Sequence, residues 1–309
     1  MQDNHKIYIN NPRESWITDR FRKEWMEHNK NTSKFLSKSS IIWLIAPWQW
    51  EKISTHHLKS KKVVCTIHHI DETKFDKKEI DNFAKRDLFV DYYHVPSIKT
   101  FNQVKNLTSK RIFTIPFWVN QNIFKDIKDK TNLREVYNID KDAFTVGSFQ
   151  RDTEGHDLQS PKLSKGPDIF IDNILELRKK EKNLLVLLAG YRRHYVINEL
   201  NKHNIPFMYF ERTSLKIIND LYNCLNLYLV TSRVEGGPAA ITECAISKTP
   251  IISRDVGLAR EFLHANSIAN DNLITNAKPD TSYAYEKTKR ISIPNGMKRF
   301  NEMFLSFKN

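Results

Sequence analysis

Short apolar runs alternate with amphipathic segments throughout the second half of the chain. The apolar runs span residues 144–148, 184–189, 206–210, 225–231 and 250–253. The segments between them, 168–182, 194–203, 214–222 and 239–247, repeat their apolar residues at helical spacing. Strands and helices that alternate in this way form a parallel sheet with helices on both faces. The pattern therefore predicts a doubly wound α/β domain in this half.

The first half shows the same alternation less cleanly. Its expected strands span residues 6–9, 41–46, 62–68, 89–94 and 111–117, and the clearest helical pattern spans 14–28. We expect two Rossmann-like domains, 1–140 and 141–285, with a linker near 120–142. We also expect a C-terminal helix within 286–309, which could pack back on the first domain. Because ligands of such sheets bind at the carboxyl ends of the strands, the expected site is a cleft between the domains.

Composition separates the two halves further. With 309 residues, 40% of them hydrophobic, the chain can bury one core per domain. All eight glycines lie between Gly147 and Gly296, whereas all six tryptophans precede residue 119. A half without glycine cannot form a glycine-rich phosphate loop. We therefore expect the second half to hold any nucleotide phosphate.

The formal net charge of +13 implies attraction to polyanions. Nucleic acid, an anionic membrane surface and phosphorylated small molecules all fit this charge. Nucleic acid is disfavoured as a partner because zinc-finger spacing, a basic leucine zipper and an aromatic-basic single-strand motif are all missing from the sequence. Weak association with an anionic membrane surface stays open.

The cysteines and the apolar runs bear on the compartment. The three cysteines lie in apolar runs without metal-ligand spacing, which indicates buried thiols in a reducing compartment. The N-terminus has no signal-peptide pattern, and the longest apolar runs are too short to cross a bilayer. We expect a cytoplasmic protein, with a peripheral position at the inner face of a membrane as an open option.

Residues 235–238, Glu-Gly-Gly-Pro, directly follow the apolar run 225–231. The glycines fall at a strand-to-helix turn, where the backbone can approach a ligand closely. Pro238 suits the first helical position, and the free amides behind it favour an anion such as phosphate. Glu243 follows in the second turn, where small neighbours leave room for a ligand. The alternative is an ordinary Gly-Gly helix start with one solvated glutamate.

These residues are part of two ordered motifs. The first runs Thr231-Ser232-Arg233-Val234-Glu235-Gly236-Gly237-Pro238, then Glu243-Cys244-Ala245, then residues 249–253 and Gly257. The second comprises Gly147-Ser148-Phe149 after a strand, Arg151 in the next loop, and Lys165-Gly166-Pro167-Asp168 at a helix start. Together they resemble the donor-binding signature of retaining GT-B glycosyltransferases of the family 4 type. The resemblance covers residues 144–262 well and the first half mainly by architecture.

The resemblance implies an α/β fold of the GT-B type, with two doubly wound Rossmann-like domains facing each other. It also implies metal-independent transfer of a sugar from a nucleoside-diphosphate sugar to a hydroxyl acceptor, in glycan biosynthesis and without a cofactor. The implied catalytic residues are Glu235, Arg151 and Lys165. The implied donor-binding residues are Gly147, Lys162, Arg233, Gly236, Gly237, Pro238 and Glu243. In this assignment Arg151 and Lys165 hold the diphosphate, Glu235 meets the donor sugar and Glu243 meets the ribose.

Several alternatives stay open at this point. A non-catalytic binding or scaffold protein and a sugar-nucleotide epimerase would both use the same fold. Lys162 could be an ordinary solvated lysine, and Arg233 could pair with a neighbouring carboxylate. On the acceptor side, His69 or its neighbour His68 could orient a hydroxyl together with Asp71, or be a satisfied strand-end histidine.

Two further groups are ambiguous in the sequence. Trp43, Trp48 and Trp50 could form a platform for acceptor sugar rings or an aromatic core. Asp140-Lys141-Asp142 has the D-x-D spacing of metal-dependent transferases, but it precedes a strand instead of following one. We interpret it as a solvated turn and expect no metal site.

Overall fold

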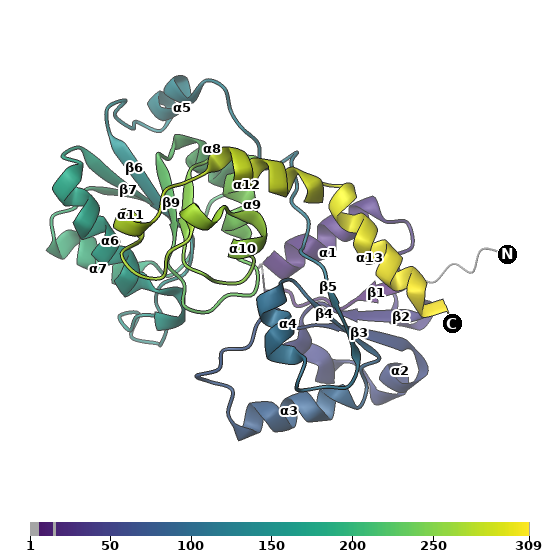
Figure 1. The fold of residues 1–309 in the computed structure, drawn as a ribbon. Helices are drawn as coiled ribbons and strands as arrows, with labels where there is room; N and C mark the ends of the chain where they lie inside the picture. The colour runs from purple at the N-terminus through teal and green to yellow at the C-terminus, as the bar shows by residue number, and fades with distance from the viewer. Residues whose placement is uncertain (1–5, 15–16, 309) are drawn as a thin grey trace. The chain divides into compact units, whose positions relative to one another are not determined.

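The computed structural model describes residues 6–14 and 17–308 of the chain, which form two compact units (Figure 1). The first unit comprises the described residues up to Trp118 and those from Ile293 onward, and the second comprises Val119–Ser292. Each unit contains a five-stranded parallel sheet. No helix among the described residues is long and apolar enough to cross a membrane.

The sheet of the first unit has the strand order β1-β2-β3-β4-β5. The strands are β1 (Ile7–Ile9), β2 (Ile41–Leu44), β3 (Lys62–Thr66), β4 (Tyr92–Val95) and β5 (Arg111–Thr114). A single parallel bridge joins Ile7 to Thr32, so the chain first passes along one side of β1 and then returns to its other side as β2. This change of direction places helices on both faces of the sheet, as the sequence predicted.

Helices α1 (Ile17–His28) and α13 (Asn295–Leu305) cover one face of this sheet. Helices α2 (Thr55–Ser60), α3 (Lys77–Asp87) and α4 (Ile98–Val104) contribute to the core on the other face. The first core is unusually aromatic: the ring of Trp25 packs 5.4 Å from Trp43 and 6.1 Å from Phe300. This cluster accounts for much of the tryptophan in the first half. Residues 15 and 16, at the start of the expected helix 14–28, lie outside the described residues.

The sheet of the second unit has the order β10-β9-β6-β7-β8. Its strands are β6 (Phe144–Ser148), β7 (Leu184–Ala189), β8 (Phe207–Phe210), β9 (Leu227–Val230) and β10 (Ile251–Ser253). The chain therefore extends the sheet from β6 toward β8 and then turns back to place β9 on the other side of β6. The point where the order reverses lies between β6 and β9, and doubly wound sheets bind ligands beside such a point.

Two cores cover this second sheet. Helices α6 (Pro167–Lys180), α7 (His194–Lys202) and α11 (Leu273–Asn276) contribute to one core. Helices α8 (Leu215–Cys224), α9 (Ala239–Ile246), α10 (Ala259–Phe262) and α12 (Thr281–Thr288) contribute to the other. Helix α5 (Lys130–Val136) lies ahead of the sheet in the chain. The three cysteines are buried free thiols, which agrees with the sequence interpretation.

The border between the units differs from the predicted position at residues 140 and 141. Residues 119–143 belong to the second unit because they hydrogen bond to α8 and the turn after it. The amides of Lys125 and Ile127 donate to the side chains of Asn219 and Asn223, each over 2.8 Å. At the C-terminus, residues 286–292 stay with the second unit, whereas α13 packs in the first.

Candidate functional site

The two motifs lie on loops that leave neighbouring strands at the same edge of the second sheet. Strands β6 and β9 pair in parallel, with Val146 opposite Leu227 and Gly147 opposite Tyr228. The chain after β6 carries residues 149–166, and the chain after β9 carries residues 231–238. The reversal in strand order thus places both loops where a ligand of this kind of sheet binds.

Lys165 and Glu235, seventy residues apart in sequence, form an ion pair between these loops. The side chains of the pair are mostly buried, with exposed fractions of 23% for Lys165 and 13% for Glu235. Ser232 donates a hydrogen bond of 3.2 Å to the same carboxylate oxygen of Glu235. Two residues of the catalytic set predicted from sequence are therefore in direct contact.

Gln150 and Ser232 tie the two loops together and were not singled out from the sequence. The Gln150 amide nitrogen donates to the Lys165 carbonyl over 2.9 Å, and the Gln150 amide oxygen accepts from the Ser232 hydroxyl over 3.1 Å. Ser232 lies within the first motif, although no role was assigned to it, and Gln150 lies between Phe149 and Arg151 of the second motif, which is the one signal that could have identified it. Their bonds hold the backbone of Lys165 and the side chain of Ser232 in place.

Gly166 explains why the two loops can approach so closely. Its φ of +60° lies in the left-handed region, and a Cβ atom there would be 2.0 Å from the Thr231 carbonyl oxygen. Only glycine fits this position. The amides of Arg233 and Val234 also donate to the Ser164 carbonyl over 2.9 and 3.1 Å. The short helical turn Leu163–Lys165 and the start of α6 are therefore fixed against the β9 loop.

Arg151 lies in the β6 loop, where its Nε donates to the Thr153 carbonyl over 2.8 Å. This is the one hydrogen bond that we find for its side chain among the described residues. Because a guanidinium carries five N–H donors, its terminal nitrogens retain donors for an anion. Lys162 lies in the same loop, and its amide donates to the Asp152 carbonyl over 2.7 Å.

A buried ion pair beneath this loop was not predicted from the sequence. The Nε atom of Arg193 lies 2.6 Å from Oδ2 of Asp152, and both side chains are at most 1% exposed. Burial raises the pKa of Asp152 and lowers that of Arg193, although each charge favours the other. Arg193 also donates to the Ser148 carbonyl over 2.6 Å. The pair therefore anchors the chain next to Arg151 to the end of β6.

Glu243 lies in α9, as predicted, but it is buried, with 5% of its surface exposed. The hydroxyl of Tyr222 on α8 donates to its Oε2 atom over 2.9 Å. Burial and the nearby carboxylate hold the pKa of Tyr222 well above its usual value, so this hydroxyl stays protonated. The sequence interpretation had the carboxylate pointing out among small side chains. It missed Tyr222, which reaches Glu243 from a separate helix.

Gly236, Gly237 and Pro238 form the turn from β9 into α9, where Pro238 occupies the position before the first helical residue, Ala239. The glycine that requires a special conformation is Gly257 in the next loop, with a φ of +48°. A Cβ atom on Gly257 would lie 2.5 Å from the Gly236 carbonyl oxygen. Close packing of these loops thus accounts for Gly257 in the motif.

Gly147 and Arg233 have structural partners. Gly147 lies within β6, where a Cβ atom would be 2.4 Å from the Leu225 side chain. Close packing of β6 against Leu225, which lies between α8 and β9, therefore accounts for this glycine. The Arg233 guanidinium forms a two-point ion pair with Asp168, over 2.7 and 2.5 Å. Hydrogen bonds from Arg233 lower the pKa of Asp168 and the same bonds raise the pKa of Arg233. The carboxylate alternative for Arg233 is the one observed.

The acceptor-side candidates lie in the first unit, after β3. His69 is exposed, whereas the ring of the half-buried His68 contacts the Ile45 carbonyl over 2.8 Å. Burial lowers the pKa of His68 to about 4. The Asp71 carboxylate accepts from the amide and the hydroxyl of Thr73, over 3.2 and 2.7 Å. Asp71 therefore stabilises a local turn.

The tryptophan group does not form one platform. Trp43 and Trp50 belong to the cores on opposite faces of the first sheet, and Trp48 is 46% exposed. Asp140 accepts from the amide of Asp142, in an exposed turn before β6. Within residues 6–14 and 17–308, no three His, Cys, Asp or Glu side chains are grouped so that they could hold a metal ion.

Comparison with known sequences gives one family. Residues 159–285, which include Lys165, Glu235 and Glu243, match the model of the family described as glycosyl transferases group 1. No curated protein matches the chain significantly.

Comparison with solved structures extends the similarity to both units. HepE from Anabaena, in complex with UDP and glucose, matches with a TM-score of 0.73 and 12% identity, over 97% of this chain and 99% of that chain. Sucrose-phosphate synthase from Thermosynechococcus elongatus matches with a TM-score of 0.70 and 14% identity, over 96% and 80%. A glycosyltransferase from Rickettsia africae ESF-5 matches with a TM-score of 0.61 and 15% identity, over 97% and 84%. These likenesses confirm the predicted GT-B fold class.

Proposed function

Since residues 159–285 form a domain of the glycosyl transferases group 1 family, we propose that the protein is a retaining glycosyltransferase. It moves a sugar from a nucleoside-diphosphate sugar to a hydroxyl acceptor, with no metal ion or cofactor, in glycan or polysaccharide biosynthesis. HepE structures contain UDP and UDP-glucose, which makes these the first nucleotide and donor to test here. The proposed location is the cytoplasm, with weak attraction to an anionic membrane surface.

The contact between Lys165 and Glu235 is the observation that carries this proposal. It joins the two motif loops at the reversal point of the second sheet, where nucleotides bind in doubly wound folds. A cation for phosphate and an acceptor for hydroxyls are thus adjacent. The hydrogen bonds of Gln150 and Gly166's close approach to Thr231 hold this arrangement without a ligand.

The cations favour departure of the nucleotide. When the glycosidic bond breaks, the leaving diphosphate gains negative charge, and fixed positive groups stabilise this charge more in the transition state than in the ground state. We assign this role to Lys165 and Arg151, with Lys162 nearby. The amides of Gly236 and Gly237 and those at the start of α9, which follow Pro238, add partial positive charge.

The two glutamates orient the donor. A carboxylate only accepts hydrogen bonds, so its two oxygens suit a pair of sugar hydroxyls. We assign Glu235, beside Lys165, to the transferred sugar and Glu243, which is deeper in α9, to the ribose. The Tyr222 hydroxyl holds Glu243 in position through its bond to Oε2.

The acceptor proton has a route that needs no side-chain base. In a front-face substitution the acceptor attacks from the side of the leaving group, and a donor phosphate oxygen takes the proton. The configuration at the sugar carbon is retained by this route. His69 and Asp71 stay the candidates for orienting the acceptor in the first unit.

A donor panel tests the proposal against its rivals. Purified protein is incubated with UDP-, GDP- and ADP-sugars, and nucleoside diphosphate release is measured with and without hydroxyl acceptors. The proposal expects acceptor-dependent release that Lys165→Ala suppresses. Conversion of the donor sugar without an acceptor would instead identify an epimerase, and binding without any turnover of the panel would favour a scaffold protein.

A further inference from the structure

The surface of the first unit contains a large pocket outside the proposed donor site. Its volume is about 760 Å³, within the range of small-molecule sites. It lies at the amino ends of the strands, next to Ile41 of β2, Lys62 of β3 and Asp91, which precedes β4. The acceptor candidates His69 and Asp71 follow the carboxyl end of β3 instead, at the opposite edge of the same sheet. The pocket is therefore separate from the proposed acceptor position.

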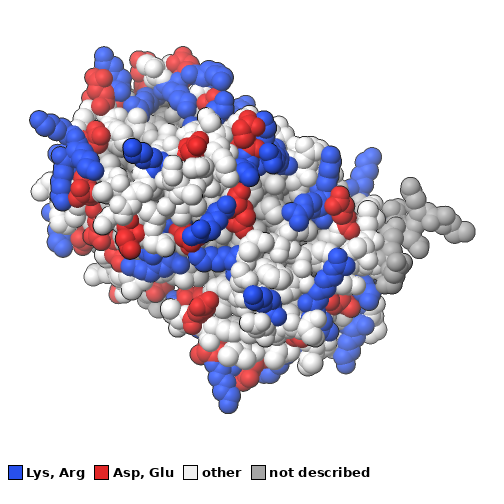
Figure 2. All heavy atoms as spheres, in the orientation of Figure 1, with Lys and Arg blue, Asp and Glu red and all other residues white. Residues whose placement is uncertain are grey.

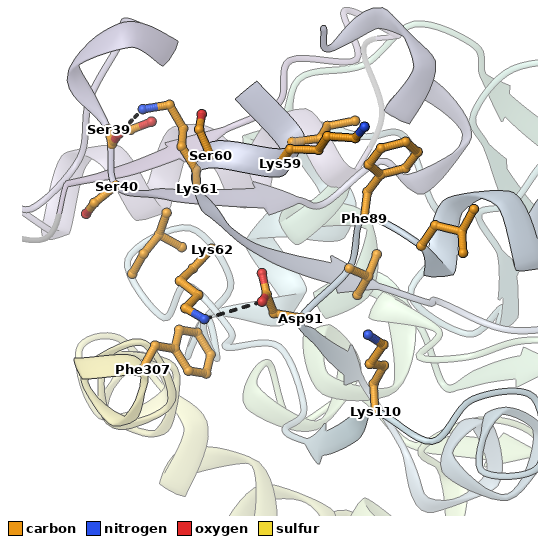
Figure 3. A pocket seen from close by; sticks show the side chains of 14 residues that line it. Ser39, Ser40, Lys59, Ser60, Lys61, Lys62, Phe89, Asp91, Lys110 and Phe307 are labelled. Carbon is orange, nitrogen blue, oxygen red and sulfur yellow. Dashed lines mark hydrogen bonds and ion pairs between the residues drawn. The ribbon is translucent and has the colours of Figure 1, made fainter. Parts of the chain in front are cut away.

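Positive charge dominates the lining of this pocket. Four lysines, Lys59, Lys61, Lys62 and Lys110, line it together with a single acidic residue, Asp91 (Figure 3). Lysine and arginine elsewhere on the visible face are interspersed with acidic side chains (Figure 2). Asp91 is already engaged, because it accepts from the Val63 amide over 2.7 Å and lies 3.4 Å from Lys62.

Among the described residues, two of the four lysines have side chains without a polar partner. Lys61 donates to the Ser39 carbonyl and is turned away from the others in Figure 3. In the described part of the chain, neither the Lys59 nor the Lys110 side chain forms an ion pair or a hydrogen bond, and the hydrogen bond of Lys110 to Thr108 is made by its backbone amide. Lys59 lies in the last turn of α2, where a cation also interacts with the helix dipole. Lys110 lies in the coil before β5, so no helix dipole accounts for its charge at this position.

Apolar residues line the pocket as well. Leu58, Leu88, Phe89 and Phe307 all line it. Leu88 is 80% exposed, although burial of a leucine side chain is favourable. In Figure 3 the Lys59 side chain extends beside the Phe89 ring. Cations and exposed apolar surface therefore lie side by side, which suits a ligand that has both an anionic and an apolar part.

We propose that this pocket binds a ligand that carries a phosphomonoester next to an apolar group. The four lysines and Asp91 leave a net charge of +3 in the lining, which complements a phosphate dianion. Ammonium groups bind phosphate as point charges from several directions, so the irregular spacing of Lys59, Lys62 and Lys110 is suitable. Such a ligand is either a soluble phosphate ester or a lipid with an exposed phosphate.

Two ligands with the same phosphomonoester distinguish the sources. Calorimetry measures binding of soluble glycerol 3-phosphate to the full chain. Co-sedimentation measures binding to phosphatidylcholine vesicles with and without phosphatidic acid. We expect phosphate-dependent binding in at least one arm, and Lys59→Ala/Lys110→Ala should weaken it by about tenfold or more, because each lysine near a phosphate contributes to the attraction.

Matched variants separate the pocket from general charge. Lys59→Arg/Lys110→Arg keeps the charge and should retain binding. Lys23→Ala/Lys298→Ala removes the same charge from the first unit outside the pocket and should leave binding within about twofold. Leu88→Ser should weaken binding to vesicles and spare the soluble ligand if a lipid is the occupant.

Binding of neither ligand, or equal losses in the Lys59/Lys110 and Lys23/Lys298 alanine variants, would overturn this inference. These measurements contain no nucleotide sugar. Failure of the phosphate site is therefore distinguishable from failure of the proposed transfer activity.

Discussion

At the scale of single residues, Lys165 and Arg151 are the side chains that we expect to bind the leaving diphosphate. Lys165→Ala and Arg151→Ala should each weaken UDP binding by about tenfold or more, since each removes a charge-assisted hydrogen bond worth about 1.5–3 kcal/mol. The rate of transfer should fall further than the affinity, because the diphosphate gains charge as the bond breaks. Calorimetry and steady-state kinetics measure the two effects. Unchanged UDP affinity in both variants would show that the phosphate site lies elsewhere.

Substitutions of Glu235 and Glu243 should have different effects on UDP binding and on sugar transfer. Glu235→Gln keeps an oxygen that can accept from Lys165 and Ser232, so binding of free UDP should change by less than about threefold while transfer is crippled. Glu243→Gln should weaken both, since we assign Glu243 to the ribose. Calorimetry with UDP, together with transfer rates, distinguishes these outcomes. Equal losses of UDP affinity in the two variants would contradict the assignment of sugar and ribose.

His68 should make the first unit sensitive to acid. Its pKa is lowered from 6.5 to about 4 by burial, so the folded state holds the neutral ring while the unfolded chain takes up a proton first as the pH falls. Stability present above pH 6.5 is therefore lost progressively down to pH 4. The free energy of unfolding of the wild type should fall between pH 7 and pH 5. In His68→Gln this fall should be smaller by about 1–2 kcal/mol.

Urea unfolding at the two pH values measures this difference. His56→Gln, an exposed change on α2, is the control and should leave the pH dependence as in the wild type. A pH dependence that is the same in His68→Gln and in the wild type would contradict the role of His68.

At the scale of elements, the contact between the β6 and β9 loops depends on Gly166. Gly166→Ala should destabilise the second unit and weaken UDP binding, because its Cβ atom would overlap the Thr231 carbonyl. Gly190→Ala is the matched control. Gly190 also has a positive φ, of +96°, but a Cβ atom there would meet no atom closer than 3.8 Å.

Gly190→Ala should therefore lower the free energy of unfolding only by the left-handed strain, about 1–2 kcal/mol, and leave UDP affinity unchanged. Thermal unfolding and calorimetry on both variants make the comparison. Equal effects of the two substitutions on UDP affinity would mean that the contact between the loops does not shape the nucleotide site.

Elements with continuous apolar sequence were predictable, and their polar partners were not. The strands 144–148 and 184–189 were predicted to the residue. Residues 184–189 are apolar throughout, which is typical of a strand buried on both faces. Arg193, the partner of Asp152, lies just before α7. Tyr222, the partner of Glu243, lies on α8. Only packing of the helices on the sheet brings them together, so no local pattern in the sequence reveals such pairs.

At the scale of the whole molecule, the two-sheet architecture follows from the alternation of strands and helices, whereas the border between the units does not. The expected linker 120–142 is polar, which is typical of a loop between domains. Within it, however, the amides of Lys125 and Ile127 donate to Asn219 and Asn223 of α8, and the segment belongs to the second unit. The two motifs of the second unit could be recognised in the sequence because each consists of short runs close together in the chain, and the first unit offered no comparable motif.

The proposed transfer requires positive charge at the leaving group, and the protein itself is expected to supply it. A transferase stabilises a departing diphosphate either with a divalent cation held by carboxylates or with protein cations and helix-start amides. We assign this task to Arg151, Lys162 and Lys165, together with the amides of Gly236, Gly237 and the start of α9. Glu235 forms an ion pair with Lys165, and Glu243 accepts a hydrogen bond from Tyr222, while Asp140 and Asp142 lie in an exposed turn before β6.

Transfer should therefore keep most of its rate in excess EDTA, and Asp140→Asn/Asp142→Asn should leave the rate nearly unchanged. Rates measured before and after chelation, with manganese or magnesium added back, provide the test. An activity lost in EDTA and restored by either ion would mean that a carboxylate set holds a catalytic metal, and the roles given to Arg151 and Lys165 would have to be reassigned.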